Sequence, residues 1–123
     1  MRRILLDTNF LIDLIKFKVE FEKFLEIFEE PIELSILSSS IKELEKIASG
    51  KGKSSNLAKL ALETIKLKKV NVLENEEEPD KAFLSIADKN TIIATNDSKL
   101  RKKLRKLGIK TIYLRGKKRL EVG

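Results

Sequence analysis

The chain alternates five times between a short apolar segment and a segment with helical spacing, and this alternation restricts its fold more than any other feature. Strands that alternate with helices in this way form parallel sheets joined by right-handed crossovers. The length of 123 residues is close to the commonest domain size. The sequence therefore predicts an α/β fold in a single domain, residues 1–123, with strands at residues 4–6, 33–37, 70–73, 91–95 and 110–114.

The strands differ in how uniformly apolar they are. The first and fourth are the most uniformly apolar, which predicts positions at the centre of the sheet, whereas the third and fifth alternate and belong nearer its edges. If the first and fourth strands are neighbours, the strand order reverses between them. Parallel α/β sheets bind ligands in the crevice that opens at such a point, outside the carboxyl ends of the strands.

Acidic residues fall where they can reach this crevice. Asp7 follows the first strand and Asp97 follows the fourth, while Glu43 and Asp80 lie near the starts of helices that leave the same edge. A simpler alternative is that Asp7 only caps the following helix, because aspartate is favoured there. Asp80 has a similar alternative, since an acid in the first helical turn complements the helix dipole.

The composition excludes several kinds of chemistry. The chain has no Cys and no His. Disulfides, cysteine zinc sites and Ser-His-Asp catalysis are therefore absent, and hydrolysis would have to rely on carboxylates, Lys or Tyr, with a bound metal ion. No apolar run approaches the ~20 residues of a membrane span, and no signal peptide is evident, so we expect a cytoplasmic protein without membrane contact.

Positive charge is concentrated near the carboxyl terminus. Residues 98–120 contain eleven Lys or Arg and no acid, whereas the chain as a whole carries +7. An acidic site beside a basic surface suits a polyanion that is held by its backbone. The alternative is a helix face that is simply solvated. The candidate polyanion-binding residues surround the leucine stripe of the expected helix, and they are Lys99, Arg101, Lys102, Lys103, Arg105 and Lys106.

Two other basic segments are predicted to be irregular. Residues 50–55, GKGKSS, resemble the end of a phosphate-binding loop, but Ile47 stands where that motif requires its first glycine, so we expect a linker. Gly108 is expected to end the basic helix. A basic tail is expected from about residue 115.

Four short motifs occur in the order that is typical of one family. They are D-T-N at residues 7–9, Glu-Leu after a serine run at 43–44, an aspartate opening an apolar helix at 80, and T-N-D at 95–97. Together they resemble the PIN-domain nucleases over nearly the whole chain. Within that family, the carboxyl-terminal half is most similar to the endonucleases that process small-subunit ribosomal RNA in archaea and eukaryotes, and less similar to the toxins of toxin–antitoxin pairs.

The resemblance implies a three-layer α/β/α sandwich with a central parallel sheet of about five strands in the order 3-2-1-4-5. It also implies a hydrolase, a metal-dependent endoribonuclease with Mg²⁺ or Mn²⁺ as cofactor. The acids that would hold the metal and carry catalysis are Asp7, Glu43, Asp80 and Asp97, with Asn9 and Thr95 in support. For the third acid, Glu76, Glu77, Glu78 and Asp88 are alternatives to Asp80.

The expected partner is RNA, in particular structured precursor ribosomal RNA. The oligomeric state is left open, with a homodimer among the options. Two other functions are compatible with the sequence: a toxin ribonuclease with an antitoxin partner, and a non-catalytic RNA-binding assembly factor. Intact acids argue against the second of these.

Overall fold

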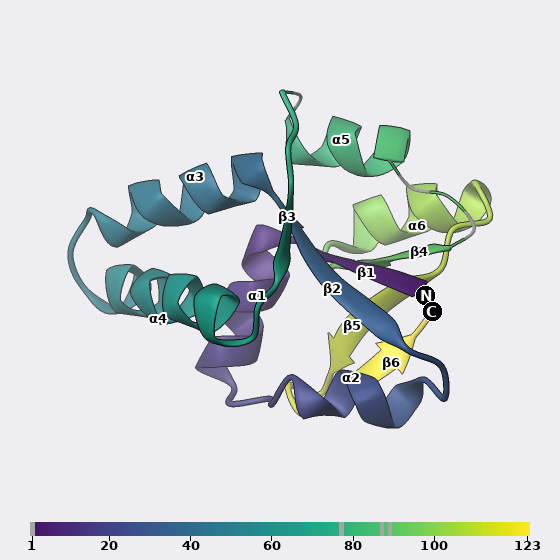
Figure 1. Cartoon of the computed structure of the whole chain (residues 1–123), viewed down its shortest axis with the longest axis horizontal. Helices are drawn as coiled ribbons and strands as arrows, with labels where there is room; N and C mark the ends of the chain where they lie inside the picture. The colour runs from purple at the N-terminus through teal and green to yellow at the C-terminus, as the bar shows by residue number, and fades with distance from the viewer. Residues whose placement is uncertain (1, 77, 87, 89) are drawn as a thin grey trace.

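The computed structural model describes residues 2–76, 78–86, 88 and 90–123, with residues 79 and 80 described through their backbone (Figure 1). Within this part of the chain no helix is long and apolar enough to cross a membrane. The elements in chain order are β1 Arg2–Leu6, α1 Thr8–Lys16, α2 Glu22–Ile27, β2 Ile32–Leu37, α3 Ser38–Ala48, α4 Lys53–Leu67, β3 Asn71–Leu73, α5 Pro79–Ile86, β4 Thr91–Ala94, α6 Ser98–Lys106, β5 Thr111–Arg115 and β6 Arg119–Val122.

One sheet of six strands forms the centre of the protein, in the order β3-β2-β1-β4-β5-β6. The first five strands run parallel, and β6 runs antiparallel to β5. Residues 4–6 of β1 and 92–94 of β4 are completely buried, as two central strands require. The predicted α/β sandwich with strand order 3-2-1-4-5 is therefore confirmed, and β6 adds a sixth, antiparallel strand to the expected parallel sheet.

Side chains on β1 alternate between two apolar cores, because successive residues of a strand point to opposite faces. Ile4 and Leu6 pack in a core that also contains residues of α1, α3 and α4. Leu5 packs in the other core, which contains residues of α5 and α6. Figure 1 shows α3 and α4 on one side of the strands and α5 and α6 on the other. The sheet is thus the middle of three layers.

The chain after residue 115 forms a turn and then a strand, where a basic tail was expected. Gly116 and Lys117 both have left-handed backbone, with φ of 61° and 62°. Two such residues in succession form the tight turn that reverses a hairpin. Residues 119–122 then pair with β5 as β6, and the Gly123 amide donates to the Thr111 carbonyl over 2.8 Å.

The expected linker at residues 50–55 is also shorter than predicted. Gly52 has a φ of +95°, and α4 begins directly after it, at Lys53. Ser55 is buried inside the first turn of this helix, and its hydroxyl donates to the Ala48 carbonyl over 2.8 Å. Only residues 49–52 therefore connect α3 to α4. Gly108 has a φ of +77° after α6, as its expected place at the helix end requires.

Candidate active site

Asp7 reaches the carboxyl edge of the sheet because it directly follows β1. It occupies the N-cap position of α1 with extended backbone, yet its side chain makes no capping hydrogen bond. Instead its Oδ2 accepts a hydrogen bond from Thr95 Oγ1 over 2.9 Å. The alternative that the Asp7 carboxylate merely caps the helix is therefore wrong.

Thr95 connects the ends of the two central strands. β1 and β4 are paired with Leu6 opposite Ala94, and the Asp7 amide donates to the Ala94 carbonyl over 2.9 Å. The completely buried Thr95 hydroxyl donates to Asp7 and accepts the Asp97 amide over 3.1 Å. A hydroxyl has one hydrogen to donate, so these two bonds also fix its orientation. Thr95 therefore holds Asp7 beside the backbone of Asp97.

Asp97 is exposed, and its side chain caps α6. Its Oδ1 accepts the amides of Lys99 over 3.0 Å and Leu100 over 3.2 Å, in the first turn of α6. Both bonds end on the same oxygen. Asp7 and Asp97 thus both occupy N-cap positions of helices that follow neighbouring strands, but their side chains are held in different ways.

Asn96, which lies between Thr95 and Asp97 in the sequence, binds to elements on both sides. Its Nδ2 donates to Asp13 Oδ2 of α1 over 2.8 Å, and its Oδ1 accepts the Leu114 amide of β5 over 2.8 Å. Neither Asp13 nor the Asn96 side chain was singled out from the sequence. The available signal was the polar residue Asp13 between two apolar residues of a mostly apolar helix.

The other predicted site residues are less closely joined. Glu43 is the sixth residue of α3 and is exposed, and Asn9 is exposed in the first turn of α1. Asp80 is the second residue of α5, and its side chain lies outside the described residues. Across the described residues, no three acidic side chains are grouped closely enough to bind a metal ion. The structure unites Asp7, Thr95 and Asp97, and the four-acid group stays a prediction.

Asn75 fixes the start of α3, the helix that carries Glu43. Its Oδ1 accepts the Ser39 amide over 3.0 Å and the Ser38 hydroxyl over 3.1 Å, and its Nδ2 donates to Ser39 Oγ over 2.8 Å. The N-cap position of this helix is Leu37, whose side chain cannot cap it. Asn75 therefore supplies the cap from the loop that leads to α5, and it draws that acidic loop toward the carboxyl edge of the sheet.

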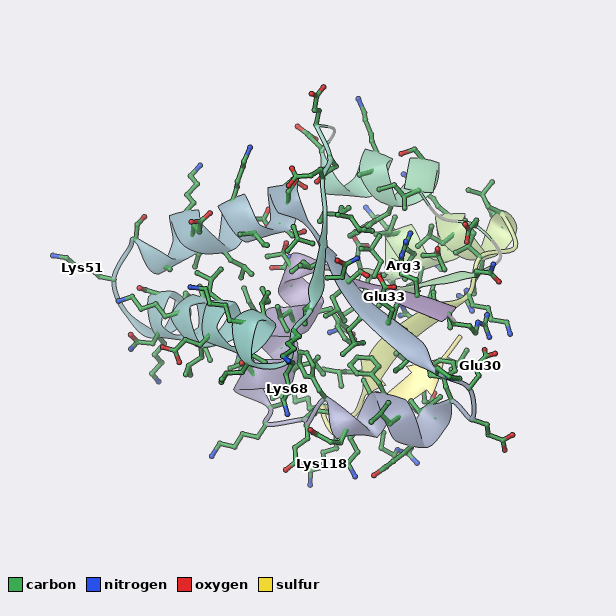
Figure 2. The ribbon with its side chains drawn as sticks, in the orientation of Figure 1. Arg3, Glu30, Glu33, Lys51, Lys68 and Lys118 are labelled. Carbon is green, nitrogen blue, oxygen red and sulfur yellow. The ribbon has the colours of Figure 1, made fainter. Side chains whose placement is uncertain are left out.

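Asp88, one alternative for the third acid, lies at the opposite edge. Its Oδ1 accepts the Asn90 amide over 2.8 Å and the hydroxyl of Thr91, the first residue of β4, over 3.0 Å. The Thr91 hydroxyl and the Asn90 amide lower the pKa of Asp88, with a smaller contribution from Arg3. Arg3 and Glu33 lie together at this amino edge in Figure 2. Asp88 is therefore excluded as a partner of Asp7. Glu77 lies outside the described residues.

The donor atoms at the carboxyl edge suit a hard divalent cation. Asp7 and Asp97 supply carboxylate oxygens, which Mg²⁺ and Mn²⁺ prefer, and the chain has no Cys or His for zinc. Two buried hydroxyls, Thr8 Oγ1 and Ser40 Oγ, have no hydrogen-bond partner within the described chain. They lie in the first turns of α1 and α3, which follow neighbouring strands at this edge. The residues present therefore fit a hydrated Mg²⁺ or Mn²⁺ ion.

Most of the candidate RNA-binding residues are exposed to solvent, where a ligand can reach them. Lys99, Lys102, Lys103, Arg105 and Lys106 are exposed on α6. Arg101 differs, because its guanidinium carbon lies 4.0 Å from the centroid of the Tyr113 ring and its Nε is buried. Arg101 therefore packs α6 against β5, and the basic surface of α6 is formed by the other five residues.

The sequence is similar to one family of known proteins over nearly its whole length. Residues 4–117 match the family model described as a PIN like domain. The chain is 37% identical to ribonuclease VapC4 of Methanocaldococcus jannaschii, covering 99% of this chain and 97% of that one. It is also 37% identical to ribonuclease VapC9 of Archaeoglobus fulgidus, covering 71% of this chain and 65% of that one.

Two solved structures share the fold. The PIN domain endonuclease Utp24 has a TM-score of 0.76 at 22% identity, covering 98% of this chain and 90% of that one. VapBC-1 of nontypeable Haemophilus influenzae has a TM-score of 0.55 at 17% identity, covering 85% of this chain and 93% of that one.

Proposed function

Because this chain belongs to the PIN-domain family of nucleases, we propose that it is a metal-dependent endoribonuclease that hydrolyses RNA phosphodiesters at the carboxyl edge of its sheet. The observation that carries the proposal is the Thr95 hydroxyl, which binds Asp7 and so keeps that carboxylate from capping α1. A carboxylate at a helix start that does not cap the helix can serve as a metal ligand. The two VapC relatives, both named ribonucleases, support RNA as the substrate.

Asp7 and Asp97 would hold the Mg²⁺ or Mn²⁺ ion, with Glu43 and Asp80 completing the acidic group. When bound, a divalent ion neutralises phosphate charge and makes hydroxide accessible near neutral pH, a function that no histidine can provide in this chain. Thr95 keeps Asp7 oriented, and Asp97 is positioned by the first turn of α6. In-line attack on a phosphodiester depends above all on such positioning and on charge neutralisation.

The exposed cations of α6 would hold the RNA through its phosphates. Asp97 caps this helix, so the acidic edge and the basic surface share one element. Contacts to phosphates fix the position of a nucleic acid without selecting its sequence. Selection of the cleavage site would then come from the shape of the RNA.

Two biological roles are candidates. One is maturation of structured precursor ribosomal RNA, supported by the resemblance of the carboxyl-terminal half. The other is that of a toxin ribonuclease with an antitoxin partner, supported by the similarity to the VapC ribonucleases and to VapBC-1. A neighbouring gene for a small antitoxin would favour the second role. Cleavage of precursor ribosomal RNA at one position would favour the first.

Asp7→Asn tests the proposed activity. The asparagine side-chain oxygen can accept the same bond from Thr95, and no capping bond is lost because the Asp7 side chain makes none, so the fold should survive. Loss of one ligand charge should abolish RNA cleavage in Mn²⁺ or Mg²⁺, while RNA binding in EDTA persists. Both are measured on a labelled structured RNA, by gel and by fluorescence anisotropy. An Asp7→Asn variant that cleaves at the parent rate would overturn the proposal.

A further inference from the structure

The basic run of residues 98–120 is divided by the fold into two separate surfaces. Its first part lies on α6, but the β5–β6 turn places Lys117 over the Phe17 ring at the end of α1 and Lys118 beside Lys23 and Glu26 of α2. Lys16 and Lys18 flank Phe17 in the sequence, and Lys16 lies over the same ring. We call the four lysines Lys16, Lys18, Lys117 and Lys118 the turn cluster. Figure 2 shows Lys118 beside α2, on the side of the molecule away from α5.

The Phe17 ring brings two members of the turn cluster together. Lys16 Nζ lies 5.4 Å from the ring centroid, and Lys117 Nζ lies 5.3 Å from the same centroid. At such distances an ammonium group is attracted to the face of an aromatic ring. Two cations that would otherwise repel each other are thus neighbours, which is a suitable arrangement for a group with negative charge on several oxygens.

The charges of the turn cluster are not neutralised by the protein. In the described part of the chain, none of its four lysines takes part in an ion pair. Two acids on neighbouring elements are already paired: Glu121 of β6 with Arg115 over 3.2 Å, and Glu26 of α2 with Lys23 over 3.5 Å. The Tyr113 hydroxyl, and then Arg115, lower the pKa of Glu121. The cluster therefore presents unbalanced positive charge to solvent.

Lysine is an unfavourable choice for the backbone at two of these positions. Lys18 has a φ of 56° and Lys117 a φ of 62°. Left-handed backbone is costly for residues with a Cβ and is normally given to glycine. The chain uses glycine at the preceding position, Gly116, but not at Lys117. Because Lys117 lies in this conformation, replacing it by glycine removes its charge and relieves its backbone at the same time.

The turn cluster also lies at the end of a continuous path from the acidic edge. β5 runs parallel to β4, so the β5–β6 turn leaves the sheet at the same edge as Asp97. Asn96 joins this end of β5 to Asp13 in the middle of α1. From Thr8 to Lys16, α1 spans roughly 13 Å at 1.5 Å per residue. Figure 1 shows α1 running from the centre of the sheet toward the loop before α2, near the hairpin.

We infer that the turn cluster binds the phosphate backbone of the RNA strand whose cleaved bond lies at Asp7 and Asp97, at a second surface separate from α6. This rests on the proposed ribonuclease function. The strand would follow α1 from the acidic edge to the β5–β6 turn. The cluster binds phosphates and reads no bases, because its ligating groups are ammonium ions at the ends of flexible side chains.

Lys117→Gly tests the inference without endangering the fold. Glycine relieves the left-handed backbone, so the melting temperature should stay the same or rise. Affinity for a short fluorescent single-stranded RNA, measured in EDTA so that no cleavage occurs, should fall on the order of fivefold. The slope of log affinity against log salt should flatten by about 0.7 for each phosphate of the single strand that the protein no longer neutralises.

Lys69→Gly is the matched control. Lys69 also has left-handed backbone, with a φ of 52°, so the change removes the same charge and relieves the same conformation. It borders a cavity of about 340 Å³ with Glu22 and Leu25 of α2. The turn cluster lies on a different face of α2, because its member Lys118 borders a groove with Lys23 and Glu26. Lys69 is therefore outside the proposed RNA-binding surface. Affinity and salt slope should be those of the parent.

The outcomes separate this inference from the proposed function. Weaker binding and a flatter slope for Lys117→Gly alone would support the inference. Equal affinity and slope for Lys117→Gly and the parent would overturn it, and the surface would then be available to an acidic protein segment. That result leaves the proposed function intact if Asp7→Asn still abolishes cleavage. A parent protein that neither binds nor cleaves RNA would overturn both.

Discussion

The Thr95 hydroxyl is a single buried group that touches both acids of the carboxyl edge. It donates to the Asp7 carboxylate and accepts the Asp97 amide, so it acts on metal binding only through those residues. Mutation of a residue that orients a metal ligand typically lowers metal affinity or activity by about 10–100-fold. Thr95 is therefore a positioning residue in the proposed mechanism.

Thr95→Val should separate positioning from folding. Valine keeps the shape of threonine but leaves the Asp97 amide without its partner, which costs about 1–3 kcal/mol of stability. We expect RNA cleavage at saturating RNA to fall by roughly 10–100-fold, and the Mn²⁺ concentration for half-maximal cleavage to rise, with RNA affinity in EDTA unchanged.

Thr95→Ser is the control for this change, since it keeps the hydroxyl. It should restore most of the cleavage rate and the Mn²⁺ requirement of the parent. If Thr95→Val cleaves RNA as fast as Thr95→Ser, the hydroxyl does not position the acids.

Asp7 and Asp97 were placed at the correct edge from the sequence, but the way in which each is held could not be predicted. Both follow an apolar strand and precede a helix, so their local sequences offer the same capping chemistry. The difference comes from Thr95, which is 88 residues from Asp7 and reaches it only because β1 and β4 are paired. The support that the family resemblance implied for Thr95 has a physical basis in this pairing.

At the scale of elements, α3 depends on a residue from another part of the chain. Asn75 replaces the capping groups that the helix lacks at its own N-cap, and it makes bonds to both Ser38 and Ser39. These bonds join the acidic loop before α5 to the helix that carries Glu43. The relative placement of two proposed ligands therefore depends on one amide side chain.

Asn75→Ala should destabilise the protein by about 1–2 kcal/mol, because the Ser39 amide loses its acceptor and α3 loses its cap. Urea unfolding measures the loss, and hydrogen exchange should become faster at the start of α3. The matched control is Asn71→Ala, which removes only an exposed bond to Glu33 on the neighbouring strand. If both variants unfold at the same urea concentration, Asn75 is not the cap of α3.

The elements that were predicted best from sequence are those whose pattern depends on burial. The fully buried segments of β1 and β4 were placed at the centre of the sheet because both faces of those strands are covered. β6 was missed because its R-L-E-V sequence carries two charges and continues a basic run, and its pairing depends on the turn at Gly116. The cap from Asn75 was also missed, since nothing local marks a bond across 36 residues.

At the scale of the whole molecule, the placement of charged side chains lowers the stability of the metal-free fold. The net charge is +7, yet Asp7 and Asp97 lie at the carboxyl edge of the sheet, while cations lie on α6 and over Phe17. Carboxylates that share a small region repel one another. A cation that binds there relieves this repulsion, and it stabilises only the folded state. Folding stability and metal binding should therefore be linked.

This linkage predicts that metal stabilises the parent protein more than the Asp7→Asn variant. In EDTA, Asp7→Asn should be as stable as the parent or more stable, because one negative charge is gone from the acidic edge. In millimolar Mn²⁺ the parent should gain about 1–3 kcal/mol, as a ligand well above its dissociation constant provides, and its Tm should rise by roughly 3–8 °C. The variant should gain less than half of that, since it has lost a ligand. Thermal unfolding followed by circular dichroism, with and without Mn²⁺, gives all four values. A parent Tm that does not respond to Mn²⁺, or an equal rise in both proteins, would show that Asp7 belongs to no metal site.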